Sequence, residues 1–191
     1  RSATSPESGM PPRESSSSTT VTINDGTAPV FGELPDIDHV VGEIVNGRLI
    51  ASLGDPDEDS GPVVSTGAYG TCAGETERIV RWGPFVAIVV VDPDGTETFA
   101  AYRLDLNYGD VRTDVVDLET LSGLKAGFSV LQLEQIYSTF DLTYEVVEGL
   151  GTTFQLYSST TGNLLLWGPV TSDESTGYVL GIYSPDACGR F

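Results

Sequence analysis

The chain has 191 residues, of which 28 are acidic and 9 are basic, and its formal net charge at pH 7 is -19. A surface with this charge repels nucleic-acid backbones and anionic lipid surfaces, so we expect no nucleic-acid partner. The longest apolar run, Phe85–Val91, has the length of a strand. Because a membrane-spanning helix needs roughly 18 to 20 apolar residues, we also expect no membrane span.

Residues 1–31 are dominated by Ser, Thr, Pro and Gly and lack the apolar side chains that would offset the entropy of ordering them. We expect a tether here, preceding a strand-rich part of about 160 residues. Tethers of this kind often follow the lipidated cysteine of bacterial envelope lipoproteins, so a lipid anchor is kept as an alternative. The chain begins at Arg1, as a processed mature form would, and we expect an extracellular or cell-envelope location.

The first structured segment is predicted to be a helix over residues 39–54. Val41, Ile44, Val45, Leu49 and Leu53 recur at helical spacing, and Gly54 can end the helix in the left-handed conformation. An acidic loop is predicted over residues 55–61, followed by a strand at residues 79–82.

The next element is the apolar run Phe85–Val91, which is predicted to be a central strand because both of its faces are apolar. A tight turn over residues 92–95 then leads into a strand over residues 96–104. Pro84 lacks a backbone N–H, so the tripeptide at residues 82–84 marks a bulge or a strand end.

The second half opens with a clearer helix signal. Ser129 is an N-cap with Gln132 three residues later, which forms a capping box. Strands are predicted to follow at residues 143–148, 152–158, 163–167 and 178–183, and a further candidate strand lies at residues 111–118 in the linking segment. We therefore predict a strand-rich α+β fold of two tandem repeats, each a helix followed by an antiparallel meander, over residues 32–121 and 122–191. The tripeptide Trp-Gly-Pro recurs at residues 82–84 and 167–169.

Cys72 and Cys188 are the only cysteines, and their spacing is not that of metal ligands. We predict a disulfide between them, which would fasten the first half to the C-terminal segment. The alternative is a pair of buried thiols in a cytosolic protein.

Asp55, Asp57 and Asp59 alternate as in a calcium-binding loop, although Ser60 stands where such a loop has glycine. The sequence contains no motif of a serine hydrolase: His39 is the one histidine that could act as a base, and no Gly-x-Ser-x-Gly segment is present. We expect a protein that is not an enzyme and needs no cofactor, and we keep the three aspartates as a candidate metal site.

Aromatic residues on or beside the predicted strands are candidate binding residues, because an exposed sheet face that carries aromatic rings makes a docking platform. The candidates are Trp82, Trp167, Tyr157 and Tyr178. Burial in the core is the alternative role for each of them.

The segments Leu53-Gly-Asp-Pro-Asp-Glu-Asp-Ser-Gly61, Tyr69-Gly-Thr-Cys72 and Val80-Arg-Trp-Gly83, with a helix start at Gly123, resemble a group of uncharacterised secreted or lipoprotein-like proteins of actinobacteria. More distantly, the helix-then-meander plan and its start at Gly127-Phe-Ser129 are similar to β-lactamase inhibitory protein and to small outer-membrane assembly lipoproteins. The resemblance implies a module that binds proteins through an exposed sheet face.

These observations together predict a non-catalytic extracytoplasmic module whose partner is another protein or a second copy of itself. A calcium-dependent extracellular binding module and a protein that acts like the β-lactamase inhibitor are the alternatives.

Overall fold

The computed structural model describes residues 22–23, 50, 53–107, 118–186 and 188. The strands are β1 (Thr22–Ile23), β2 (Glu58–Val64), β3 (Thr76–Trp82), β4 (Phe85–Val91), β5 (Glu97–Asp105), β6 (Glu119–Thr120), β7 (Asp141–Val147), β8 (Gly151–Tyr157), β9 (Leu164–Pro169) and β10 (Gly181–Tyr183). A short helix, α3 (Val130–Ile136), precedes β7. No helix among the described residues is long and apolar enough to cross a membrane.

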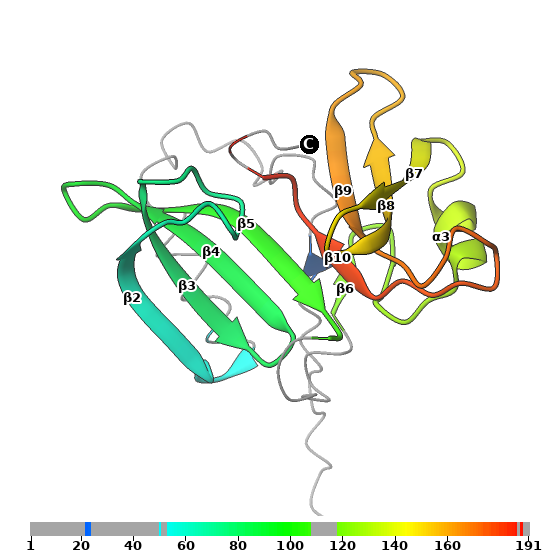
Figure 1. Ribbon diagram of the computed structural model, residues 1–191. Coiled ribbons are helices and arrows are strands. Elements are labelled where there is room, and N and C mark those ends of the chain that lie inside the picture. Colours follow the sequence, from blue (N-terminus) through cyan, green and yellow to red (C-terminus); the bar gives the residue numbers. More distant parts are fainter. Residues whose placement is uncertain (1–21, 24–49, 51–52, 108–117, 187, 189–191) are drawn as a thin grey trace, which may run out of the picture.

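Eight of the strands form one antiparallel sheet in the order β2-β3-β4-β5-β10-β9-β8-β7. The sheet consists of two four-stranded meanders, β2 to β5 and β7 to β10, which join through their last strands (Figure 1). β1 and β6 form a separate two-stranded parallel sheet.

The predicted α+β fold of two helix-plus-meander repeats is therefore wrong. The two meanders share a single sheet, because β5 and β10 pair with each other rather than each remaining an open edge with unpaired backbone groups. The repeated Trp-Gly-Pro tripeptide also has two different roles: Gly83 and Pro84 form the turn between β3 and β4, whereas residues 167–169 lie inside β9. The tripeptide is consequently no sign of a structural repeat.

Of the predicted first helix, the structure describes the C-terminal turn. Ile50 and Leu53 are helical, and the Gly54 N–H donates to the Ile50 carbonyl at 2.9 Å with a φ of 76° at the glycine. The rest of that helix, the tether, and most of the candidate strand at residues 111–118 lie outside the described residues.

Several local predictions agree with the structure. β4 has the predicted bounds and is buried on both faces at its start, and the turn after it is closed by a hydrogen bond of 2.8 Å from the Gly95 N–H to the Asp92 carbonyl. In α3, the Ser129 side chain accepts from the Gln132 backbone while the Gln132 side chain accepts from the Ser129 N–H, as predicted. The acidic segment predicted as a loop is instead largely the strand β2.

The main hydrophobic core lies on one face of the sheet and draws on both meanders. Trp82 and Phe85 from the first meander and Phe154 and Leu166 from the second belong to the same buried cluster. Helix α3 contributes Leu133 to this cluster, and the helix covers the β7–β8 end of the sheet (Figure 1). The opposite face of the first meander carries a smaller cluster that is made of Val86, Ile88 and Ala101, with Tyr69 and Ile79 packed against it.

The junction between β9 and β10 requires glycine. A Cβ added at Gly168 would collide with the carbonyl oxygen of Gly181, so the two backbones approach too closely for any side chain. Next to this junction, the Tyr183 hydroxyl donates to the buried Asp105 carboxylate, which links β10 to β5.

Candidate functional site

The predicted disulfide between Cys72 and Cys188 is present, with the two Cα atoms 5.2 Å apart. It ties the loop between β2 and β3 to the segment that follows β10. The same loop contacts Asp186 at Gly70. A Cβ added at Gly70 would lie 2.7 Å from Asp186 Oδ1, and the φ of this residue, 97°, also favours glycine. The bridge therefore secures a contact between segments that are far apart in the sequence.

Arg103 on β5 is enclosed by aromatic rings beneath this loop. Its guanidinium carbon lies 5.7 Å from the ring centre of Tyr69, 5.8 Å from that of Trp167 and 5.2 Å from that of Tyr183. Its Nη2 also lies 3.4 Å from the buried Asp186 carboxylate. These contacts hold the two meanders together on the face opposite the main core.

The candidate binding aromatics divide into two pairs. Trp82 is fully buried and its indole N–H donates to the Gly54 carbonyl at 2.9 Å, while Trp167 is 2% exposed and donates to the Ser184 carbonyl at 3.1 Å. Both tryptophans are core residues and offer no surface to a partner. Tyr157 is partly buried and Tyr178 is 55% exposed, and a binding role for these two stays a prediction.

The candidate calcium ligands do not point at a common centre. Asp57 Oδ2 accepts from the Gly83 N–H at 2.6 Å, and the Asp59 carboxylate is held by Arg78. Asp55 is exposed. Within the described residues, the one group of three possible metal ligands that lie close together is Cys72, Glu75 and Cys188, whose sulfurs are joined in the disulfide.

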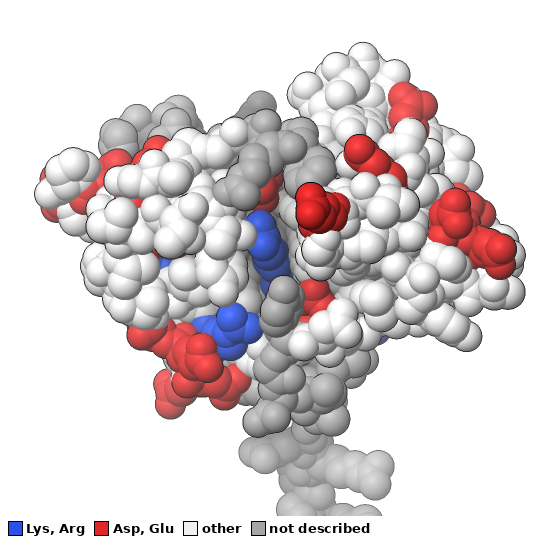
Figure 2. All heavy atoms as spheres, in the orientation of Figure 1, with Lys and Arg blue, Asp and Glu red and all other residues white. Residues whose placement is uncertain are grey.

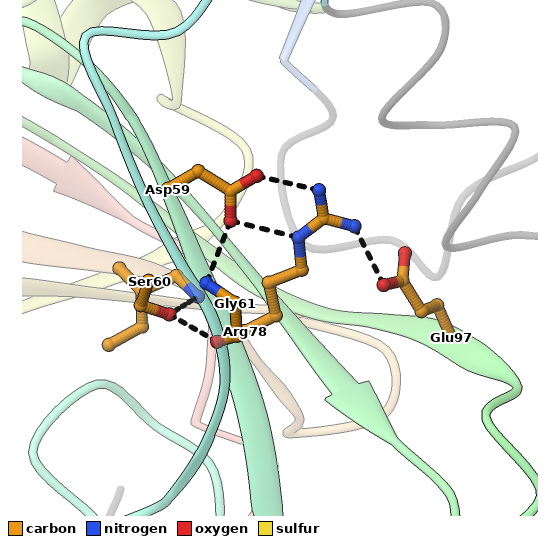
Figure 3. A network of polar contacts seen from close by, with 6 residues as sticks. Asp59, Ser60, Gly61, Arg78 and Glu97 are labelled. Atoms are coloured by element: carbon orange, nitrogen blue, oxygen red, sulfur yellow. Dashed lines mark hydrogen bonds and ion pairs between the residues drawn. The ribbon is translucent and has the colours of Figure 1, made fainter.

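Asp59, Arg78 and Glu97 form an ion network across β2, β3 and β5. The Arg78 guanidinium donates to both Asp59 oxygens, at 3.0 Å and 2.7 Å, and to Glu97 Oε1 at 2.7 Å. Figure 3 shows the guanidinium between the two carboxylates, with the Gly61 N–H also directed at Asp59. The hydrogen bond from Arg78 is the main cause that lowers the pKa of Asp59.

Replacing Asp59 with asparagine is expected to lower the melting temperature at pH 7, and the effect should shrink as the pH falls below 3.8. Because the pKa is lower in the folded state than the usual 3.8, the carboxylate stabilises the fold fully above that value and loses this contribution as the pH falls through the folded pKa. The pair is partly exposed, so the loss is about 0.5 to 1 kcal/mol. Thermal melts of wild type and Asp59→Asn from pH 2 to 7 test this, with Asp55→Asn as the control. A difference in melting temperature between wild type and Asp59→Asn that is the same at every pH would contradict the expectation.

A shallow pocket of about 280 Å³ lies where β2 and β3 meet the Tyr69 loop. It is lined by Glu58, Asp59, Ser60, Tyr69, Ile79 and Arg81. Its polar groups are already engaged: the Ser60 hydroxyl accepts from the Ile79 N–H at 2.9 Å, and Arg81 Nε lies 3.4 Å from Glu58. The pocket therefore has little free hydrogen-bonding capacity for a small ligand.

A chain of hydroxyl and carboxylate groups connects Ser65, Thr71 and Glu77. The Ser65 and Thr71 hydroxyls lie 2.7 Å apart, and the Thr71 hydroxyl donates to Glu77. All three residues are buried, so this chain is closed to a substrate and holds the β2–β3 loop in place.

Charge is distributed unevenly over the molecule. Each basic side chain in the described part has a carboxylate partner: Arg78 pairs with Asp59 and Glu97, Arg81 with Glu58, Arg103 with Asp186, and Lys125 with Glu119. Residues 126–186, which include the whole second meander, contain no Lys, Arg or His. They do contain Glu134, Asp141, Glu145, Glu148, Asp173, Glu174 and Asp186, and carboxylates are visible over this half in Figure 2.

The outermost strand of this acidic half, β7, is an edge of the sheet, and no described strand pairs with its outer side. The Thr152 carbonyl on β8 points to the side of the sheet that holds β9, where it accepts from the N–H of Val170, the residue after β9, at 2.9 Å. Val146 stands opposite Thr152 in a pair that shares no hydrogen bond, so the N–H and carbonyl of Val146 point away from the sheet. By alternation, the backbone groups of Leu142 and Tyr144 point outward as well.

Nothing in the part of the chain that the structure describes bonds to these outward groups of Leu142, Tyr144 and Val146. Val146 is 77% exposed, and β7 contains no Pro, no Gly and no bulge. Tyr144 is anchored to α3, since its hydroxyl donates to Glu134 at 3.4 Å, and burial raises the pKa of the Tyr144 hydroxyl, with Glu134 adding to the shift. β7 is therefore a regular, supported strand whose outer side is unpaired among the residues that the structure describes.

The opposite edge, β2, is less suited to pairing. It carries Gly61 and Pro62 in its interior and a register shift between Asp59 and Pro62. Proline and bulges are devices that keep edge strands from pairing with other chains. After this shift, residues 62–64 of β2 pair with consecutive residues of β3.

Sequence reasoning predicted the strand over residues 143–148 but not its place at the edge of the sheet. Alternation of apolar and polar residues, Leu142, Tyr144 and Val146 against Thr143 and Glu145, marks a strand with one covered face. The absence of a neighbour on its other side depends on the strand order, which has no local signal. Comparison of the chain with protein-family models, curated proteins and solved structures gave no match.

Proposed function

We propose that this protein is a non-catalytic module that works outside the cytoplasm and binds another protein, accepting an extended segment of its partner along β7. The open outer side of β7 is the observation that carries the proposal. Strand addition of this kind gains main-chain hydrogen bonds at each outward residue, while the alternating side chains provide specificity.

Two features support the location and the non-catalytic role. A disulfide between distant segments is typical of proteins that mature in an oxidising compartment. The described hydroxyl and carboxylate chain at Ser65, Thr71 and Glu77 is buried, and the shallow pocket beside Arg81 offers few free polar groups. Binding through the backbone of an edge strand needs neither a pocket nor a catalytic group.

Hydrogen exchange tests the open edge directly. In the free protein, the amides of Leu142, Tyr144 and Val146 are expected to exchange fast, and those of Thr143 and Glu145 slowly because they face β8. A capped peptide of alternating Thr and Val, about as long as β7, is expected to slow exchange at the three outward amides. Peptide contacts at the Arg81 pocket, or the absence of any protection at millimolar peptide, would contradict the proposal.

Val146→Pro is the matching variant, because it removes one outward N–H without breaking the β7–β8 ladder. Its control is Val64→Pro on β2. Val64 is 72% exposed and is also an outward residue, since the next N–H, that of Ser65, donates inward to the Glu75 carbonyl at 2.8 Å. We expect peptide binding to be lost in Val146→Pro and kept in Val64→Pro.

A further inference from the structure

We propose that the segment that β7 accepts is an amphipathic strand, with Lys or Arg on one face and apolar residues on the other. This inference rests on the proposed function and specifies the partner. It follows from the way β7 divides its side chains between the two faces of the sheet and from the charge of the half of the molecule that surrounds it.

The two faces of β7 differ in chemistry. Leu142 and Tyr144 pack against the main hydrophobic core, so the apolar side chains of β7 lie on that face. Glu145 lies on the other face, where its carboxylate accepts from the Gln155 Nε2 at 3.0 Å. Asp141 and Thr143 share that second face by alternation, and all three are exposed.

The polar face of β7 therefore presents two carboxylates, Asp141 and Glu145, four residues apart on one exposed edge. A strand lying beside β7 would place every second side chain next to these carboxylates, within the reach of a lysine or arginine. No basic side chain between residues 126 and 186 competes for them. Charge complementarity thus favours basic residues at alternate positions of the partner.

The other face favours apolar residues at the remaining positions. Val146 is 77% exposed on this face, and Leu142 and Tyr144 are partly exposed beside it. An incoming strand would set its apolar residues against this row and remove Val146 from water. The partner pattern is therefore a basic and an apolar residue in alternation over about seven positions.

A second copy of the chain fits this edge poorly. Two β7 strands side by side would bring together two halves that carry acidic residues and no basic ones, in a protein of net charge -19. Like charges across a strand pair are destabilising, and overall repulsion opposes the encounter. The occupant is a different, basic protein segment.

Fluorescence anisotropy with labelled, capped peptides tests the inference on the full-length oxidised protein. The probes are an alternating Lys-Val peptide, an alternating Thr-Val peptide, an alternating Glu-Val peptide, and a peptide of the same Lys and Val content with the lysines in one block. We expect the Lys-Val peptide to bind roughly 2- to 30-fold tighter than the Thr-Val peptide at low salt, from two opposite-charge cross-strand pairs. Its advantage should shrink as salt rises.

Charge variants of the protein locate the effect. Glu145→Lys is expected to remove the preference for the Lys-Val peptide, because the new ammonium group and the remaining Asp141 carboxylate then share the polar face of β7. Asp55→Lys, an exposed site before β2, makes the same change in net charge and should leave the preference unchanged. Thr143→Lys adds a positive charge between the two carboxylates on the same exposed face and should reduce the preference if Glu145→Lys fails to fold.

The outcomes separate this inference from the proposed function. Equal binding of the Lys-Val and Thr-Val peptides, both lost in Val146→Pro, would overturn the basic partner and leave strand addition standing. If the Lys-Val peptide binds Val146→Pro as tightly as wild type, or if the block peptide binds as tightly as the alternating one, the interaction is charge attraction without strand pairing. Either result would overturn both the inference and the proposed function. A dimer that light scattering detects in wild type and not in Val146→Pro would assign the edge to a second copy and overturn the inference.

Discussion

Removal of the disulfide by the double substitution Cys72→Ser and Cys188→Ser is expected to lower the free energy of unfolding by about 4 to 5 kcal/mol. The bridge spans a sequence separation of 116 residues. In the chain-entropy model, closing a loop of that length lowers the entropy of the unfolded chain and so raises its free energy by this amount. The corresponding fall in melting temperature is roughly 10 to 20 °C for a chain of this size.

Chemical denaturation of wild type and of the double variant measures the change, with reductant added to each. Reductant should lower the stability of wild type to that of the double variant and leave the variant itself unchanged. A difference of about 1 kcal/mol or less would show that the unfolded chain is held compact by other means.

Replacing Trp82 with alanine is expected to cost about 3 to 5 kcal/mol of stability. The side chain is fully buried in the main core, lies 6.2 Å from the Phe85 ring, and donates to the Gly54 carbonyl. Its removal leaves a cavity and an unpaired carbonyl at the end of the helical turn before β2.

The exposed tyrosine provides the contrast. Tyr178→Ala removes a ring that is 55% exposed and should change the free energy of unfolding by no more than about 0.5 kcal/mol. Equilibrium unfolding monitored by circular dichroism compares the two variants. If Trp82→Ala were as stable as wild type, its assignment to the core would be wrong and the predicted role in binding would return.

Sequence patterns predicted those features that depend on neighbouring residues. The capping box at Ser129 and Gln132, the turn after β4 and the apolar run of β4 each have a local signature, and each is present. The disulfide followed from the presence of two cysteines. These features can be predicted without knowing which strands pair with each other.

The strand order could not be predicted in this way. Pairing of β5 with β10 is made by backbone groups of segments far apart in the sequence, and backbone groups are the same in every residue. β2 was missed because nearly every residue in it is exposed, so no alternation marks it. Trp82 and Trp167 were predicted as candidate binding residues, but both are buried. Alternation assigns a residue to one face of a strand and does not show whether that face is covered.

The strand order also has a consequence for the sequence of events in folding. Within each meander, successive strands are neighbours in the chain, and the longest connections are residues 65–75 and 170–180. Tyr183 and Asp105, which join β10 to β5, are instead 78 residues apart, so this pairing closes a much longer loop. Cys188 lies five residues beyond β10 and reaches Cys72 once that long-range pairing has formed. We therefore expect oxidation of the two thiols to come late, so that the bridge stabilises a sheet that is already complete rather than guiding its assembly.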